Sequence, residues 1–227
     1  MKILDFGISD YESILSLQTK LFESLKNDKI NNKKGKEIIL IGEHEPVITL
    51  GRRAKEENLL VSESFLKSQG IKVYHIGRGG DVTYHCPGQM IVYPVLDLER
   101  HQIGVKDYVN LMEEAIIILL KKYNINGERI EGATGVWIGK GSDQERKICA
   151  MGIKCSRFCT MHGLALNVNS DLSGFSMINP CGFQDKGVTS IKKETGQQIE
   201  IKKIKEEFLH IFLSLIFPFE KILDFSK

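Results

Sequence analysis

Residues 105–123 read VKDYVNLMEEAIIILLKKY, and this stretch decides the fold class. Its apolar residues recur every three or four positions, which is the spacing of an amphipathic helix packed on a core. The residues on that shared face are Val105, Tyr108, Val109, Met112, Ile116, Leu119 and Leu120. Lys121 and Lys122 follow where the negative end of the helix dipole favours cations. The sequence therefore predicts a core helix in the middle of the chain.

Short strand-like segments lie on both sides of this helix. They cover residues 38–41, 47–50, 71–76 and 90–98 before it, and 125–130, 135–138, 147–153 and 163–168 after it. Pro94 interrupts one of them, which predicts an edge strand or a bulge. Further helices are predicted near residues 11–25, 62–69 and 201–217, with a surface loop over 26–36. Strands and helices do not alternate regularly, so we expect an α+β fold, a mixed β-sheet with packed helices, in one domain over residues 1–227.

Composition limits the possible partners and the cellular compartment. Hydrophobic residues make up 42% of the chain and charged residues 26%, with a net charge of +2 and dispersed lysines, so no nucleic-acid partner is expected. No apolar run reaches the roughly 18 residues that span a bilayer, so no membrane partner is expected either. Five cysteines without paired spacing argue against a disulfide framework. A cytoplasmic location is the expectation.

A glycine-rich stretch at residues 77–85, GRGGDVTYH, is the first candidate for a binding loop. Its glycines allow a tight turn and close approach of the backbone to a ligand, while Arg78 and His85 supply polar groups. The stretch lacks the spacing of a phosphate-binding P-loop. An ordinary glycine-rich hairpin explains it equally well.

Two residues far apart in the sequence suggest nucleophilic chemistry. Lys147 opens the apolar segment 147–152, and Cys181 lies between Pro180 and Gly182 in a turn that would present its sulfur. A thiol reacts as the thiolate, and a nearby ammonium group can lower its pKa. The alternatives are an incidental loop cysteine and a lysine that reaches solvent from the end of a strand.

Two further patterns remain ambiguous. Gly163 and Ala165 leave space on one strand, either for an alkyl chain or for a neighbouring helix. Cys149, Cys155, Cys159 and His162 suggest zinc only weakly, because structural zinc sites usually use short paired spacings. No metal is expected.

Five segments in series resemble one family, the lipoyl(octanoyl) transferases of lipoate biosynthesis, which are related in fold to lipoate and biotin protein ligases. The segments are residues 42–53 (GEHEPVITLGRR), 78–89 (RGGDVTYHCPGQ), 147–152 (KICAMG), 162–169 (HGLALNVN) and 175–182 (FSMINPCG). The resemblance implies a biotin/lipoate protein ligase-like catalytic domain.

The resemblance also implies roles for individual residues. Cys181 would carry the acyl group as a thioester, and Lys147 would lower the thiol pKa and move protons. Acyl-substrate binding is implied for Arg78, Gly79, Gly80, Asp81, Val82, Thr83, Tyr84, His85, Ala150, Met151, Gly152, Gly163, Leu164 and Ala165. The sequence departs from the family pattern at Asp81, where glutamine is more usual, and at Cys86, where glycine is.

The activity implied is octanoyl transfer from octanoyl-acyl carrier protein to a lysine of a lipoyl domain. The acceptors would be the lipoyl domains of 2-oxo-acid dehydrogenase complexes and the glycine-cleavage H protein, and no cofactor is expected. Two alternatives remain open. An ATP-dependent lipoate-protein ligase would share the fold but need no cysteine, and a non-catalytic acyl-binding or carrier-binding protein would bind without turnover.

Overall fold

The computed structural model of the chain describes residues 1–179 and 187–217. A large sheet runs in the order β1–β2–β6–β10–β9–β8–β7, with the short β11 beside β9. These strands are β1 (Lys2–Ser9), β2 (Ile38–His44), β6 (Gln89–Val95), β7 (Glu128–Ile130), β8 (Ala133–Ile138), β9 (Arg146–Ser156), β10 (Cys159–Asn167) and β11 (Gly187–Val188). The β1–β2 and β11–β9 pairs are parallel and the others antiparallel, which confirms the predicted mixed sheet.

A second, smaller sheet consists of β4 (Lys72–His75), β3 (Val47–Leu50) and β5 (Val82–His85). It has its own apolar core, in which Ile48 and Leu50 pack with Leu66 and Phe175. Leu66 belongs to α2 (Glu63–Ser68), and Phe175 belongs to the 3-10 helix η2 (Leu172–Met177). The glycine-rich stretch at residues 77–81 connects β4 to β5.

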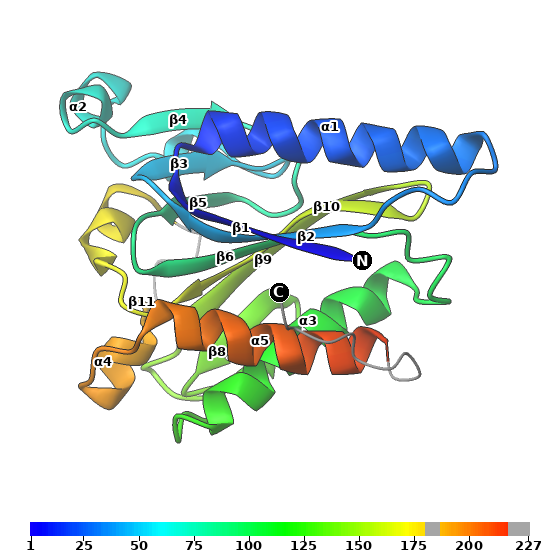
Figure 1. The fold of residues 1–227 in the computed structure, drawn as a ribbon. Helices are drawn as coiled ribbons and strands as arrows, with labels where there is room; N and C mark the ends of the chain where they lie inside the picture. Colours follow the sequence, from blue (N-terminus) through cyan, green and yellow to red (C-terminus); the bar gives the residue numbers. More distant parts are fainter. Residues whose placement is uncertain (180–186, 218–227) are drawn as a thin grey trace.

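Helices cover both faces of the large sheet (Figure 1). α3 (Val105–Lys121) and α5 (Ile201–Ile216) lie on one side and share its main core, whereas α1 (Tyr11–Ile30) lies on the other. Two shorter elements are η1 (Glu56–Asn58) and α4 (Ile191–Thr195). The predicted core helices and the α+β class are thus confirmed. No helix in the described part of the chain is both long and apolar enough to cross a lipid bilayer.

The first helix is longer than its apolar spacing predicts, so the expected loop from residue 26 is wrong for its first five residues. Asp10 caps the start of α1, where its carboxylate accepts a hydrogen bond from the Ser13 backbone N–H at 3.0 Å. At the other end, the Lys29 ammonium pairs with the Asp97 carboxylate at 2.5 Å. Tertiary contact therefore extends the helix beyond its apolar face.

The prediction that Pro94 marks an edge strand is wrong, because β6 is central and pairs with β2 and β10. The irregularity falls on β10 instead. Its pairing with β6 stops at Leu164, and His162 has φ +60°, which is rare within a strand. The His162 backbone N–H donates to the Gln18 side chain of α1, and the Thr160 hydroxyl donates to the Pro94 carbonyl. Side chains thus replace the missing ladder bonds.

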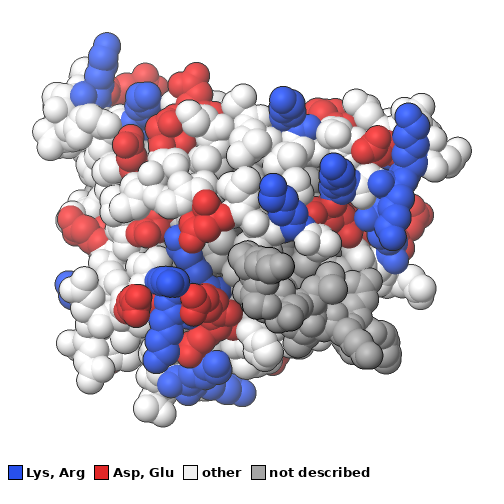
Figure 2. All heavy atoms as spheres, viewed as in Figure 1, with Lys and Arg blue, Asp and Glu red and all other residues white. Residues whose placement is uncertain are grey.

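Positive and negative side chains are interspersed on the face of the molecule in Figure 2. Among the described residues as a whole, several lysines and arginines are held in ion pairs, including Lys29 with Asp97 and Arg146 with Glu194. Charge on this face is therefore mixed rather than gathered into one patch of a single sign.

Candidate active site

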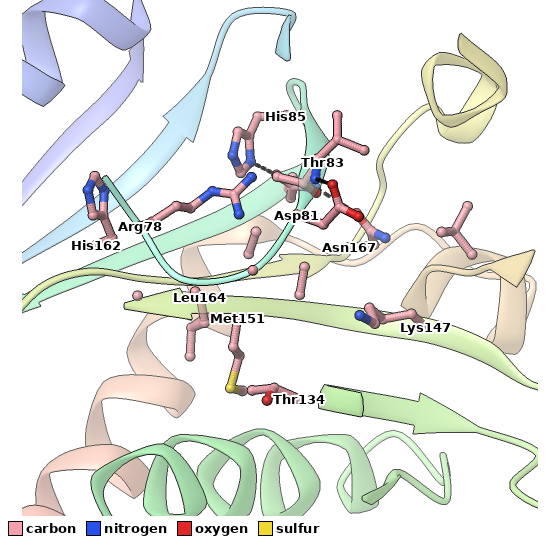
Figure 3. A pocket seen from close by; sticks show the side chains of 18 of the residues that line it. Arg78, Asp81, Thr83, His85, Thr134, Lys147, Met151, His162, Leu164 and Asn167 are labelled. Carbon is pink, nitrogen blue, oxygen red and sulfur yellow. Dashed lines mark hydrogen bonds between the residues drawn. The ribbon is translucent and has the colours of Figure 1, made fainter. Parts of the chain in front are cut away.

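A cavity of about 320 Å³ lies between the small sheet with its glycine-rich loop and the β9–β10 face of the large sheet (Figure 3). This volume is at the lower end of the range for small-molecule sites. Most residues that the sequence singles out meet here. They are Arg78, Gly80, Asp81, Val82, Thr83 and His85 from the loop and β5, Lys147, Ala150, Met151 and Gly152 from β9, and Gly163, Leu164 and Ala165 from β10.

The glycine-rich loop lies directly on β9. The Gly79 backbone N–H donates to the Ile153 carbonyl at 2.8 Å, so Gly79 holds the loop in place and does not line the cavity. A Cβ at Gly152 would lie 2.5 Å from the Gly79 carbonyl oxygen. Glycine at residue 152 is therefore required for this close approach.

Alternation along β5 separates two sets of side chains. Thr83 and His85 line the cavity, while Tyr84 points to the other side and packs edge-on against Phe175, with ring centroids 5.6 Å apart. Side chains of a strand alternate between its two faces. The structure therefore brings Tyr84 into the core of the small sheet and not into the cavity.

Arg78 is a buried cation at the cavity wall, with 8% of its surface exposed. Its Nη2 donates to the Thr49 carbonyl at 2.7 Å and to the Thr49 hydroxyl at 2.9 Å, and its Nη1 donates to the Gly79 carbonyl at 3.0 Å. These bonds fix the guanidinium group between β3 and the loop.

His85 is held in one tautomer by its neighbours. The Gln89 amide nitrogen donates to the Asn167 side chain at 2.8 Å and to the Tyr84 carbonyl at 3.3 Å. The Gln89 oxygen, 2.7 Å from His85 Nδ1, must then accept, so Nδ1 carries the hydrogen. Burial, helped by the neighbouring His44 and Arg78, lowers the pKa of His85 to about 3, so His85 is neutral at pH 7.

The sequence analysis assigned no acyl-binding role to several other groups at this end of the cavity. Tyr11 and Tyr93 line it, and both rings contact the buried His44. His162 lines it as well, and burial followed by the Arg78 charge lowers its pKa to about 3. Gln89, His162 and Asn167 were within reach of sequence reasoning, since they lie in the segments that carry the family resemblance. Tyr11 and Tyr93 come from distant elements and leave no local signal.

Lys147 lies at the opposite end of the cavity from His162 (Figure 3). Its ammonium nitrogen is 4.5 Å from the centroid of the Trp137 ring, a favourable cation–π distance. Its backbone carbonyl accepts a hydrogen bond from the Thr189 N–H at 3.0 Å, next to the β11–β9 pairing. The neighbouring Arg146 forms two hydrogen bonds with Glu194, at 2.7 and 2.6 Å. β9 is therefore firmly held where it presents the lysine.

Cys181 lies outside the described residues, but the other four cysteines can be assessed. Burial raises the pKa of Cys86 and of Cys159 to about 11, and it also raises the pKa values of Cys149 and Cys155. None of these four thiols lines the cavity. Within residues 1–179 and 187–217, no three His, Cys, Asp or Glu side chains converge to hold a metal ion.

The departures from the family pattern have local explanations. Both carboxylate oxygens of Asp81 accept from the Asn58 amide, at 2.9 and 2.8 Å, and one of them accepts from the Val82 N–H at 2.7 Å. The Cys86 thiol is 2% exposed and packs in the core of the small sheet. Asp81 is thus a well-bonded cavity residue, and Cys86 fills a core position.

Solved structures define the class of this fold. The chain is similar to a bipartite lipoate protein ligase from Thermoplasma acidophilum, with a TM-score of 0.67 and 17% identity over 95% of this chain and 82% of the other. It is also similar to LipL1 of P. falciparum in complex with lipoate, with a TM-score of 0.71 and 13% identity over 100% and 63%. The fold is that of a lipoate protein ligase catalytic domain.

Sequence comparison identifies the family. The lipoyl protein ligase A/B catalytic domain matches residues 10–213, and the chain belongs to this family. An octanoyltransferase of Parabacteroides distasonis is 49% identical over 93% of this chain and 96% of its own length. An octanoyltransferase of Porphyromonas gingivalis is 50% identical over 92% of this chain, which spans only 42% of that longer relative.

Proposed function

We propose that this chain is an octanoyltransferase that carries the octanoyl group as a thioester on Cys181. One observation carries the proposal: the cavity of about 320 Å³ that is walled by the glycine-rich loop and has Lys147 at one end. The octanoyltransferases of Porphyromonas gingivalis and Parabacteroides distasonis, at 50% and 49% identity, support it. The raised pKa values of the four described thiols also support Cys181, because none of those thiols suits a nucleophile.

The walls of the cavity suit an alkyl chain. The paired residues Ala150 and Ala165 of β9 and β10 contribute small apolar surface, and the two histidines that line the cavity are neutral at pH 7. Burying about six methylene groups at about 0.8 kcal/mol each contributes on the order of 5 kcal/mol to binding. That is enough to discriminate strongly against short acyl chains, whereas a difference of two methylenes is a softer preference.

In the first half of the reaction, the Cys181 thiolate attacks the thioester carbonyl of octanoyl-acyl carrier protein. A new carbon–sulfur bond forms, the bond to the carrier sulfur breaks, and the carrier thiol leaves with a proton from Lys147. A positively charged Lys147 favours the thiolate before the attack, and it is neutral after the transfer.

In the second half, the ε-amino group of a lysine on a lipoyl domain attacks the octanoyl-enzyme. The amide bond forms as the bond to Cys181 breaks, and neutral Lys147 accepts the proton that the amine loses. Both residues then return to their starting state. The acceptors are the lipoyl domains of 2-oxo-acid dehydrogenase complexes and the glycine-cleavage H protein, and the reaction takes place in the cytoplasm.

Mass spectrometry after incubation with octanoyl-acyl carrier protein tests the proposal. We expect a mass increase of one octanoyl group on Cys181, and no adduct in Cys181→Ala. Cys155→Ala is the matched control, because Cys155 is the most exposed described thiol and lies outside the cavity. An adduct on another cysteine would refute the assignment.

The same preparation separates the proposal from its two alternatives. Transfer to a lipoyl domain that required ATP but survived Cys181→Ala would identify a ligase. Binding of the acyl carrier without transfer to any lipoyl domain would identify a non-catalytic protein. We expect transfer without ATP that is lost with Cys181.

A further inference from the structure

Residues 51–60 connect two parts of the site that are distant in sequence. The first half of this segment bonds to the glycine-rich loop: the Gly51 N–H donates to the Asp81 carbonyl at 3.1 Å, and the Arg53 N–H donates to the Gly80 carbonyl at 3.1 Å. These bonds fix the segment against the loop that lines the cavity.

The second half of the same segment bonds to residues 177–179. The Leu60 N–H donates to the Met177 carbonyl at 2.9 Å, and the Asn179 N–H donates to the Asn58 carbonyl at 2.9 Å. Between these two bonds, Leu59 and Ile178 form an antiparallel bridge. Residues 58–60 therefore pair through their backbone with residues 177–179, which lead towards Cys181 in the sequence.

One side-chain contact joins the two halves. The Asn58 amide nitrogen lies 2.9 and 2.8 Å from the two carboxylate oxygens of Asp81, and Asn58 is 5% exposed. A hydrogen bond to a charged acceptor is stronger than one between neutral groups. Asn58 thus bonds to the cavity loop with its side chain and to Asn179 with its backbone.

We propose that Asn58 and Asp81 form a positioning pair that holds the acyl-binding loop and the segment preceding the nucleophile in one fixed arrangement. The inference rests on the proposed function, because it takes Cys181, two residues after Asn179, as the nucleophile. Neither side chain performs chemistry. The pair fixes Asn179, two residues before the proposed nucleophile, relative to the acyl-binding loop, and a displacement of about 1 Å in a reacting group can cost on the order of a hundredfold in rate.

Because Asn58 donates and Asp81 accepts, the pair can be tested by exchanging the two residues. In Asn58→Asp, two carboxylates face each other and repel. In the double variant N58D/D81N, the amide introduced at position 81 can keep its oxygen on the Val82 N–H, as Asp81 Oδ1 does now, and donate from its nitrogen to the carboxylate introduced at position 58. The contact is then restored with donor and acceptor exchanged.

The experiment measures the single-turnover rate of octanoyl-Cys181 formation by mass spectrometry, over a range of octanoyl-acyl carrier protein concentrations. We expect N58D to lower the maximal rate at least about tenfold, the size expected for loss of a hydrogen bond to a charged group, and N58D/D81N to return it to within about threefold of the parent. The donor concentration for half-maximal rate should change much less. Glu57→Gln is the matched control, since Glu57 is an exposed neighbour paired only with Lys55 among the described residues.

A second comparison covers the case in which N58D does not fold. Asp81→Asn keeps the contact if the Asn58 amide turns to accept from it, so it should retain the rate within about threefold, whereas Asp81→Ala should lose about tenfold. Circular dichroism at the assay temperature establishes that each variant is folded.

The positioning role is overturned if folded N58D acylates as fast as the parent, if the exchange fails to restore the rate, or if Asp81→Asn and Asp81→Ala behave alike. Failure of the proposed function looks different, because the parent protein itself would then form no octanoyl adduct on Cys181.

Discussion

Acidification should destabilise this protein well before its carboxylates titrate, because three histidines are buried in the neutral form. Burial lowers the pKa of His44 to about 4 and the pKa values of His85 and His162 to about 3, from an ordinary value of 6.5. Between these values the unfolded chain binds more protons than the folded chain. The free energy of unfolding is therefore highest above pH 6.5, where these histidines are neutral in both states. It decreases as the pH falls from 6.5 towards 3–4.

The magnitude follows from the linkage relation. At pH 5.5 a histidine that is neutral when folded and titrates at 6.5 when unfolded costs about 1.4 kcal/mol, so the three together cost about 4 kcal/mol. Glu37 and Glu194, whose pKa values are lowered from 4.5 by hydrogen bonds and neighbouring charges, each add only about 0.1 kcal/mol or less at this pH. A loss of about 4 kcal/mol is a large part of the stability of a typical domain.

Urea unfolding followed by circular dichroism at pH 7.5, 6.5 and 5.5 measures this loss. His44→Asn and His85→Asn should each remove about 1.4 kcal/mol of the pH dependence. Asparagine can still donate where the Nδ1 atoms now bond, to the Ser9 carbonyl and to Gln89. His210→Asn, at an exposed position of α5, should leave the pH dependence unchanged. A total loss below about 1 kcal/mol, or equal slopes in all variants, would refute the reasoning.

Three further outcomes follow from the site and the fold. Lys147→Ala should shift iodoacetamide alkylation of Cys181 to higher pH, and an unchanged profile would contradict the proposed dyad. Gly152→Ala places a methyl group 2.5 Å from the Gly79 carbonyl oxygen, so it should lower octanoyl transfer at least about tenfold and stability by about 1–3 kcal/mol, measured by transfer assay and urea unfolding. The β9–β10 turn holds Arg157 at φ +50° and Phe158 at φ +62°, a backbone region that asparagine and glycine adopt more readily. R157N/F158G should therefore stabilise the protein by about 1 kcal/mol or more. A lower midpoint of urea unfolding would show that the native side chains compensate for the strain.

The elements that could be predicted from the sequence are those whose pattern is local. α3 and α5 carry an apolar face at helical spacing, and β3 is a short apolar run that matches its prediction at both ends. β5 was not recognised as a strand, because residues 82–85 follow directly on the glycine-rich loop. Its strand character depends on pairing with β3, which lies about thirty residues earlier in the chain.

The candidate site shows the same division. The loop and the segments of β9 and β10 could be found from the family resemblance, yet which side chains enter the cavity depends on strand alternation. Tyr84 is excluded for this reason, and Tyr11 enters because its ring lies against Tyr74 of β4 and His85 of β5. Pro94 predicted an irregularity on β6 itself. The unusual backbone conformation, a positive φ, is instead at His162 of the neighbouring strand β10.

The buried Arg78 links acid sensitivity to catalysis. Four hydrogen bonds hold its guanidinium group to Thr49 and Gly79, so its charge serves the structure of the cavity wall. Burial is the main reason that the pKa values of His85 and His162 are low, and the Arg78 charge lowers both in the same direction. Protonating either ring would place a second buried cation near Arg78 at the cavity wall. The rate of octanoyl-enzyme formation should therefore fall together with stability as the pH decreases. His85→Asn should make both the rate and the stability less sensitive to pH. If only the stability became less sensitive to pH in this variant, acyl transfer would not depend on a neutral residue at position 85.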